Sequence, residues 1–402
     1  MSTRRRFTMH GGLAIASLAG IATSASARAQ TSASASADGV LQVGPRRRIK
    51  TIREASKLAQ RGTTIEVDAG DYAGDVATWS QDDVHLRAVG GRARLLANGA
   101  SEARKGIWVV RARGLVVEGF DFEGAVVPDH NGAGIRLDRG SLRVRDCRFL
   151  HNQMGLLTGN DPGTELVVEN SEFAYNQRPD GHNHNLYVGR IARLSVTGSY
   201  FHHARTGHLL KSRAALNLIR YNRLTDEAGG TASYELEFPD GGVAVVVGNI
   251  IGQSNGTENR HMVSFGAESY FWRRNAIYLS HNTLINPLAW TGIFLRVAPG
   301  VASITAVNNL LVGDGDLNTA GPGDYRNNLH AQARDLADLD NFDCALRSNS
   351  PLVGLAVDAR TANGVDLKPR YEYRHPRATR ALAGLAHNPG AIQLVTQPAS
   401  KR

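Results

Sequence analysis

Short β-rich segments recur along the chain, each followed by a polar turn and by an apolar residue that we call the anchor. The segments "SLRVRDCRFLHN", "ELVVENSEFAYN" and "RLSVTGSYFHHA" show this order. The anchors are Phe122, Phe149, Phe173, Phe201, Leu224, Ile251, Leu284 and Leu311. Successive anchors are 23 to 33 residues apart. This period is too long for the hairpins of a sandwich and is typical of one coil of a solenoid.

An asparagine lies two residues before the anchor in four successive coils, as Asn222, Asn249, Asn282 and Asn309. Asparagine tolerates the left-handed backbone of a turn, and its side-chain amide can bond to the coils above and below. We therefore expect the four residues to stack as a ladder. The repeat with this ladder resembles the right-handed parallel β-helix of the pectate-lyase-like superfamily over roughly residues 40–330. The resemblance implies an all-β chain built as a right-handed parallel β-helix.

The segments on either side of the coils have different patterns. In "TIREASKLAQRG" the apolar residues from Ile52 to Ala59 share one helical face, and Gly62 is a natural end for the helix. In the superfamily such a helix covers the open strand edges of the first coil, so we predict a capping helix. After about residue 330 the coil pattern fades, and residues 331–402 are predicted to form a tail packed on the solenoid.

The first residues predict export from the cytoplasm. Residues 1–29 contain a basic start with Arg4 and Arg5, a short apolar run and a small-residue cleavage site, as in a twin-arginine-type signal peptide. Residues 30–39 are predicted to be a low-complexity tether. No later segment has the length needed to span a bilayer. We expect the mature chain to be a periplasmic or secreted monomer.

The charge balance is mildly basic and indicates an anionic partner. The net charge of +9 falls to +5 when residues 1–29 are removed. The basic residues are scattered without an aromatic-basic platform, so we expect an acidic polysaccharide and no nucleic acid. Cys147 and Cys344 are far apart in sequence and outside any metal-type spacing. Cys147 is predicted to be a small buried hydrophobe, and a disulfide stays open.

The segment "SYELEFPDGG" places two carboxylates, Glu235 and Glu237, in a predicted strand. Because side chains alternate along a strand, we expect both to point to the same face. Stacking the strands by their anchors places Asn185, His208 and His261 in the outward column of Glu235. This column predicts a polar groove across neighbouring coils.

Three segments around this column are rich in ionisable side chains: "DGHNHNLYVG", "TGHLLKSRA" and "NRHMVSFGAE". A single histidine in a turn is more often an ordinary hydrogen-bonded surface residue than a catalyst. The gathering of several such residues in three consecutive coils predicts a functional site. They are His182, His184, Asn185, Tyr187, His208, Lys211, Arg213, Arg260, His261 and Glu268.

Many members of the superfamily cleave uronate polysaccharides by β-elimination. This reaction needs a neutralised substrate carboxylate, a base that removes the C5 proton and an acid for the departing O4. By this resemblance Lys211 and Arg213 would supply the base and the charge clamp. The other candidates for the base or acid are His184, Tyr187 and His208. The candidates for substrate binding are Asn185, Arg260 and His261.

The site pattern also resembles the chondroitinase B and alginate lyase branch, in which an asparagine and two glutamates hold Ca²⁺. The matching residues are Asn185, Glu235 and Glu237. The sequence departs from that branch because no lysine follows shortly after the glutamate pair and two histidines flank Glu235 in the column. His208, Glu235 and His261 would instead suit a transition metal such as Zn²⁺. The same groups can also be hydrogen-bonded together without a metal, so all three readings stay open.

We therefore predict a secreted polysaccharide lyase, and three alternatives remain. A uronan C5-epimerase shares the proton abstraction. A glycoside hydrolase can use two carboxylates on one strand, but the aspartate-rich signature of such hydrolases is missing at the glutamate coil. A non-catalytic glycan-binding solenoid should show a repetitive aromatic face, which this chain lacks. Lys211 and Arg213 can also simply pair with Glu237 or Asp240 on the next coil.

Overall fold

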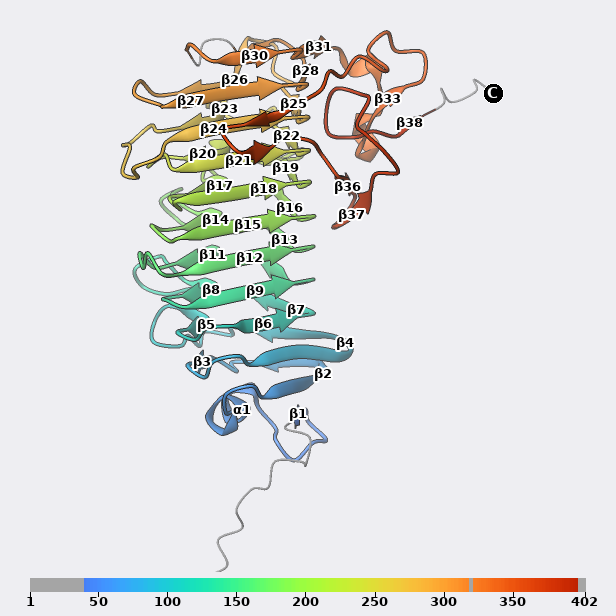
Figure 1. Ribbon diagram of the computed structural model, residues 1–402. Helices are drawn as coiled ribbons and strands as arrows, with labels where there is room; N and C mark the ends of the chain where they lie inside the picture. The colour runs from blue at the N-terminus through green and yellow to red at the C-terminus, as the bar shows by residue number, and fades with distance from the viewer. Residues whose placement is uncertain (1–39, 318–320, 397–402) are drawn as a thin grey trace, which may run out of the picture. The chain divides into compact units, whose positions relative to one another are not determined.

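The computed structural model describes residues 40–317 and 321–396 of the chain. These residues form a right-handed parallel β-helix of about 10 coils, which confirms the predicted fold (Figure 1). Strands of successive coils pair in parallel, so that each sheet runs along the stack. The predicted signal peptide (1–29) and tether (30–39) lie outside the described residues.

One face of the β-helix is a ten-stranded sheet with one strand from each coil. Its strands in chain order are β3 (Ala77–Trp79), β5 (Gly106–Val110), β8 (Ala133–Leu137), β11 (Met154–Thr158), β14 (His184–Val188), β17 (His208–Ser212), β20 (Tyr234–Phe238), β23 (His261–Phe265), β26 (Gly292–Val297) and β29 (Gly315–Asp316).

The remaining faces belong to a 21-stranded sheet, in which most coils contribute two short strands. It begins with β1 (Val40–Val43), β2 (Thr64–Ala73), β4 (His85–Leu96), β6 (Leu115–Glu118), β7 (Phe120–Glu123), β9 (Ser141–Arg145), β10 (Arg148–Leu150), β12 (Glu165–Glu169), β13 (Glu172–Ala174), β15 (Arg193–Thr197) and β16 (Tyr200–His202). It continues with β18 (Leu216–Arg220), β19 (Arg223–Thr225), β21 (Val243–Val247), β22 (Ile250–Gly252), β24 (Ala276–Ser280), β25 (Thr283–Ile285), β27 (Ser303–Val307), β28 (Leu310–Val312), β30 (Asp324–Arg326) and β31 (Leu329–Ala331).

The anchors stack in register along the inside of the coils. Phe149 pairs with Phe122 on one side and with Phe173 on the other. The rings of Phe149 and Phe173 are stacked with 4.6 Å between their centroids. The same column continues without a break to Leu311, and all its members are buried. The predicted anchors therefore form one hydrophobic column that holds successive coils together.

The asparagine ladder is confirmed. Asn249 Oδ1 accepts hydrogen bonds from the backbone N–H of Asn222 at 2.9 Å and from its side-chain amide at 3.0 Å. Asn249 Nδ2 in turn donates to Asn282 Oδ1, and Asn282 Nδ2 donates to Asn309 Oδ1. The left-handed backbone, however, falls on the residue before each asparagine, as at Tyr221 (φ 56°). The amide bonds, and not a positive φ, therefore explain the asparagines.

The helix α1 (Ile52–Leu58) covers the first coil at the blue end of the stack in Figure 1. Thr51 caps it by accepting the backbone N–H of Glu54, and Asp75 accepts the backbone N–H groups of the first two helical residues. The helix ends at Leu58 and not at Gly62, because the next residue turns to an extended backbone. The capping helix is thus present but shorter than predicted.

Beyond β31 the chain returns along the side of the stack (Figure 1). This C-terminal segment contains β32 (Leu336–Asp338), β33 (Asp343–Arg347), β34 (Thr361–Ala362), β35 (Val365–Asp366), β36 (Tyr371–Arg374), β37 (Ala378–Ala381), β38 (Val395–Thr396) and the 3₁₀ helices η2 (Ala333–Asp335) and η3 (Leu339–Asn341). It bonds to two coils that are not neighbours: the backbone N–H of Ala391 donates to Thr283 Oγ1 at 3.0 Å, and that of Arg370 donates to the Tyr221 hydroxyl at 2.9 Å.

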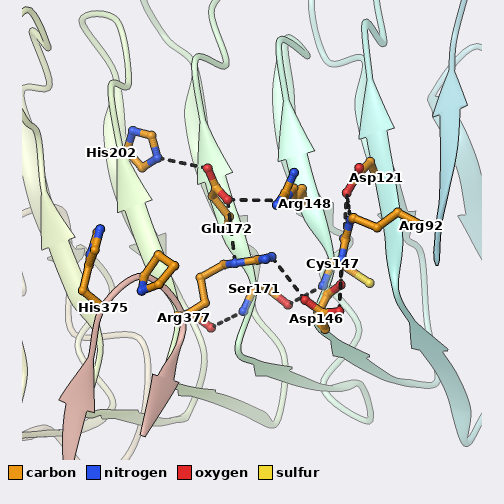
Figure 2. Close-up of polar contacts among 12 residues, drawn as sticks. Arg92, Asp121, Asp146, Cys147, Arg148, Ser171, Glu172, His202, His375 and Arg377 are labelled. Carbon is orange, nitrogen blue, oxygen red and sulfur yellow. Dashed lines mark hydrogen bonds and ion pairs between the residues drawn. The ribbon is translucent and has the colours of Figure 1, made fainter. Parts of the chain in front are cut away.

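Arg377 ties this segment to the earlier coils through a charged network (Figure 2). Its guanidinium lies 3.3 Å from the carboxylate of Asp146 and 3.8 Å from that of Glu172. Arg92 pairs with the same Asp146, and His202 Nε2 lies 3.4 Å from Glu172. The C-terminal segment therefore reaches from the last coils back to β10 and β13.

Cys147 and Cys344 are both buried and free, so the prediction for Cys147 is confirmed and no disulfide joins them. Burial raises the pKa of the Cys147 thiol to about 12, which keeps it protonated. Among the described residues, no helix is both long enough and apolar enough to cross a membrane.

Candidate functional site

The outward face of the ten-stranded sheet carries two rows of polar and aromatic side chains. In the first row the register pairs His184 with His208 and His208 with Tyr234, and the ring of Tyr234 faces that of His261 at 6.4 Å. The second row consists of Tyr187, Lys211, Glu237, Ser264 and Arg296. These rows bring together most of the ionisable residues predicted from the sequence.

Glu235 does not point outward as predicted and is fully buried. The register pairs Leu210 with Leu236, whereas the prediction aligned Leu209 with Leu236. Leu209 and Leu210 are both buried in the same hydrophobic core. The chain bends immediately before β20, so the first residues of the strand do not follow the flat alternation. As a result Glu235 enters the core, whereas Glu237 contacts the outward rows.

The predicted Ca²⁺ set of Asn185, Glu235 and Glu237 is not brought together. Asn185 is fully buried, and its amide is used inside the coil: Oδ1 accepts from Asn176 at 2.7 Å and Nδ2 donates to the carbonyl of His202 at 2.8 Å. Two of the three proposed ligands therefore face the core. Asn185 is also excluded from binding a substrate on the outward face.

The predicted transition-metal set of His208, Glu235 and His261 fails for a related reason. The two histidines face outward, but Tyr234 stands between them in the row and Glu235 lies on the other side of the strand. In the described part of the chain no group of three or more His, Cys, Asp or Glu side chains is placed to hold a metal ion. The residues present therefore do not fit Ca²⁺ or a transition metal.

Glu237 is the central acid of the outward face. Its side chain is 5 % exposed, and Oε2 lies 2.9 Å from Lys211 Nζ and 3.2 Å from His208 Nδ1. Burial raises the pKa of the Glu237 carboxyl, and the neighbouring Lys211 offsets only part of this effect.

Lys211 and Arg213 are each held by two acids. Lys211 Nζ lies 3.0 Å from Glu268 Oε1, in addition to its contact with Glu237. Arg213 Nη1 lies 2.7 Å from Asp240 Oδ1, and its Nη2 lies 2.7 Å from Glu268 Oε2. Burial alone would lower the pKa of the Lys211 ammonium, but the two glutamates outweigh burial and leave the pKa raised. Both side chains therefore carry a positive charge, and both make the acid pairs considered as an alternative.

Arg213 is fixed by further contacts on the far side of the cluster. Its Nε donates to the Tyr187 hydroxyl at 3.0 Å, and its backbone carbonyl accepts from Trp272 Nε1 at 2.9 Å. The fully buried Asp240 also accepts from Arg190 Nε at 2.7 Å. The guanidinium of Arg213 consequently has little freedom, as expected for a group that binds a carboxylate in a fixed orientation.

His184 and His208 form a pair of rings with 4.7 Å between their centroids. Burial, together with the nearby Lys211, lowers the pKa of His208 to about 3, and burial also holds the pKa of His184 well below its usual value. Both imidazoles are therefore neutral at pH 7. Because Nδ1 of His208 faces Glu237, its Nε2 is the nitrogen that remains to accept a proton.

His261 lies at one edge of the outward face, beside two exposed arginines. Its Nδ1 is 2.8 Å from Asn259 Oδ1. Burial lowers the pKa of His261, and Arg296 and Arg260 lower it further. Neither arginine makes an ion pair within the described residues, so both stand free to meet an anion. The predicted binding role of Arg260 and His261 stays a prediction.

We name the Lys211 cluster the set His184, Tyr187, His208, Lys211, Arg213, Glu237, Asp240 and Glu268. The sequence reasoning missed Tyr234, which occupies the histidine row, and Arg190, which shares Asp240 with Arg213. The signal for Tyr234 was its place as the first residue of its strand, the position that His208 and His261 hold in theirs. His182 lies apart, exposed and next to Asp180.

Two cavities lined partly by the C-terminal segment are separate from this face. The first, of about 390 Å³, is lined by residues that include Phe342, Cys344, Tyr373 and His375. The second, of about 590 Å³, lies between residues 302–305, 322–326 and 360–363. Neither is lined by a member of the Lys211 cluster.

The structure is similar to the crystal structure of pectate lyase Pel9A, with a TM-score of 0.58 and 15 % sequence identity over 83 % of this chain and 96 % of that chain. The described residues share the parallel β-helix fold of that structure. A pectin methylesterase from Aspergillus niger matches with a TM-score of 0.36 at 14 % identity, over 83 % of this chain and 95 % of that chain. A PL6 family alginate lyase, AlyGC, matches with a TM-score of 0.30 at 14 % identity, over 78 % of this chain and 55 % of that chain. No protein-family profile and no curated protein matches the chain.

Proposed function

We propose that the protein is a polysaccharide lyase that cleaves a uronate-containing polysaccharide by β-elimination at the Lys211 cluster. The observation that carries the proposal is that two cationic side chains and a neutral imidazole lie together on one outward face. Lys211 and Arg213 supply the charge, and His208 lies beside them with Nδ1 held 3.2 Å from Glu237. The pectate-lyase-like fold supports the class of substrate by analogy only.

The three requirements of the elimination can be assigned to residues of the cluster. Lys211 and Arg213 would neutralise the substrate carboxylate, on which the enolate-like intermediate concentrates its charge. His208 would take the C5 proton through Nε2. The Tyr187 hydroxyl, which accepts a hydrogen bond from Arg213, would protonate the departing O4. Lys211 is a poorer base than His208, because Glu237 and Glu268 keep its ammonium protonated.

Hydrolysis is less well supported by this geometry. Glu237 and Glu268 are the two acids that contact Lys211, and its Nζ lies 2.9 Å from the first and 3.0 Å from the second. An ammonium between the two carboxylates leaves no room for the water or the anomeric carbon that a glycosidase needs there.

Incubation with a panel of uronate polysaccharides tests the proposal. Elimination creates an unsaturated sugar, which is followed by its ultraviolet absorbance. New reducing ends without that absorbance would identify a hydrolase. Inverted C5 centres in intact polymer, seen by NMR, would identify an epimerase. Binding without any product would identify a glycan-binding solenoid.

We further propose that the chain acts outside the cytoplasm, because residues 1–29 have the pattern of an export signal. Cell fractionation with antibodies against the β-helix tests this: the protein should appear in the periplasm or the medium. Cytoplasmic protein with its N-terminus intact would contradict it.

A further inference from the structure

Glu268 differs from the other acids of the Lys211 cluster in its exposure. Its side chain is 47 % exposed, whereas those of Glu237 and Asp240 are 5 % and 0 % exposed. Its two oxygens nevertheless bridge the two cations, with Oε1 at 3.0 Å from Lys211 Nζ and Oε2 at 2.7 Å from Arg213 Nη2. Glu268 therefore places a carboxylate on the solvent side of both cations.

Each cation also has a buried acid of its own. Lys211 keeps its contact with Glu237, and Arg213 keeps its contact with Asp240, whether or not Glu268 is in place. If the Glu268 side chain left the cluster, each cation would therefore still have an acid partner. Ion pairs that involve a half-exposed side chain are weak, so exchange of one carboxylate for another at this position costs little.

The backbone around Glu268 is fixed, so the exchange needs only a side-chain movement. The backbone N–H of Glu268 donates to the carbonyl of Pro239 at 3.0 Å. The N–H of Phe271 donates to the carbonyl of Asp240 at 3.1 Å, and Trp272 Nε1 donates to the carbonyl of Arg213. The segment between β23 and β24 is thus anchored at Glu268 and on its C-terminal side, while the carboxylate itself reaches solvent.

We propose that the Glu268 carboxylate occupies the place where the carboxylate of an acidic sugar binds, and that the ligand displaces it. Glu268 is then a built-in competitor that holds Lys211 and Arg213 in the binding arrangement while no ligand is present. The identity of the ligand as a uronate rests on the proposed function. The position of the anion site rests on the contacts of Glu268.

Isothermal titration with sodium glucuronate and sodium galacturonate tests the inference, with glucose as the neutral control ligand. The Glu268→Gln variant should bind at least one of the two uronates about five- to tenfold more tightly than the native chain, because it removes the competing charge but keeps the shape. Neither form should bind glucose. A melting temperature close to that of the native chain shows that the variant is folded.

The matched control is Glu258→Gln. Glu258 is an exposed acid in the stretch between β22 and β23, and it makes no ion pair among the described residues. Its removal changes the net charge equally but frees no cation, so uronate affinity should change by less than about twofold. Equal tightening in both variants would reduce the effect to long-range charge and overturn the inference. Weaker binding in Glu268→Gln, or no uronate binding in either form, would also overturn it.

The inference and the proposed function can fail separately. If Glu268→Gln binds uronate more tightly but neither form makes unsaturated product from any polymer, the anion site stands and the lyase proposal falls. If the native chain is an active lyase and Glu268→Gln binds uronate less tightly, the lyase stands and Glu268 is a binding residue and not a competitor.

Discussion

Glu235 is an acid in the core of a coil, where an amide would be expected. In an earlier coil Asn176 and Asn185 fill the corresponding positions and bond to each other at 2.7 Å. Asp226 and Glu235 have the same spacing in sequence, and Asp226 Oδ1 accepts the backbone N–H of the preceding coil as Asn176 Oδ1 does. Burial raises the pKa of Glu235 well above its usual value, and the nearby Asp226 raises it further. Burial therefore favours the protonated, uncharged form of Glu235.

The substitution Glu235→Gln should make the free energy of unfolding fall less steeply as the pH rises. A carboxyl whose pKa is raised on folding binds a proton that the unfolded chain has already released. Its contribution to stability is therefore complete below the unfolded pKa of about 4.5 and is lost as the pH rises, by up to about 1.4 kcal/mol per unit. Urea unfolding at pH 5 and at pH 8 should show that the variant loses less stability between the two. An equal loss of stability in the native chain and the variant would mean that the Glu235 carboxyl is solvated and not buried.

Replacing Lys211 tests the role of the cluster in the reaction. Lys211→Gln should lower kcat/KM for a uronate polymer by about 100-fold or more, because it removes a charge that stabilises the intermediate. Initial rates of unsaturated product are the measurement. Lys105→Gln is the control, since Lys105 pairs with Asp138 in earlier coils of the stack. Rates within twofold of the native chain for both variants would make the Lys211 pairs purely structural.

The assignment of His208 as the base predicts an unusually acidic limb in the pH profile. A base works in its neutral form, and burial and Lys211 lower the pKa of His208 from 6.5 to about 3. The value of kcat/KM should therefore hold through pH 6.5 and fall only in more acidic buffer. A limb centred at the ordinary histidine value would assign the base to an exposed histidine. His208→Gln should be slow across the whole range.

At the scale of the strand, the repeat was predictable but the direction of its side chains was not. The column of anchors recurs in eight coils and the asparagine ladder in four, and both depend only on the period. The directions depend on the bend before each strand, which puts the second and third residues of β17, Leu209 and Leu210, into the core together. Glu235 is aligned with Leu209 in the register of β17 and β20, so it also points into the core. The strands themselves held a signal, because β14, β17, β20 and β23 all carry a polar or aromatic residue at their first and fourth positions.

Removing one rung of the asparagine ladder should destabilise the β-helix. Asn249→Ala would leave the backbone N–H of Asn222 and the carbonyl of Ile219 without their buried partners. The expected loss is about 1–3 kcal/mol in the free energy of unfolding, measured with urea. Asn255→Ala is the control, because Asn255 is exposed in the stretch between β22 and β23. Equal stability of the two variants would mean that the ladder bonds contribute nothing.

At the scale of the whole β-helix, the C-terminal segment joins coils that do not touch each other. In a simple solenoid each repeat contacts only its neighbours, so stability is local. Here Arg377 reaches Asp146 and Glu172 (Figure 2). Ala391 reaches Thr283. We expect this segment to make the unfolding of these coils more cooperative than the strands alone would.

The substitution Arg377→Gln should loosen only the coils that Arg377 contacts. Hydrogen exchange should become faster at β10 and β13 and stay unchanged at β26, with a local loss of about 1 kcal/mol or less. Arg374→Gln is the control, since Arg374 is exposed and makes no ion pair within the described part. Faster exchange along all strands would mean that Arg377 stabilises the entire stack. Unchanged exchange at β10 and β13 would mean that its contacts do not stabilise these coils.

The returning segment also limits how this protein can change in evolution. Solenoids commonly gain or lose a repeat, since each new coil needs only its two neighbours. A coil inserted between Asp146 and Thr283 would move these two docking points apart by about 4.8 Å along the stack. The segment that carries Arg377 and Ala391 would then miss one of them. A duplication of one coil would therefore require a matching insertion between Arg377 and Ala391, more than ninety residues downstream of Thr283.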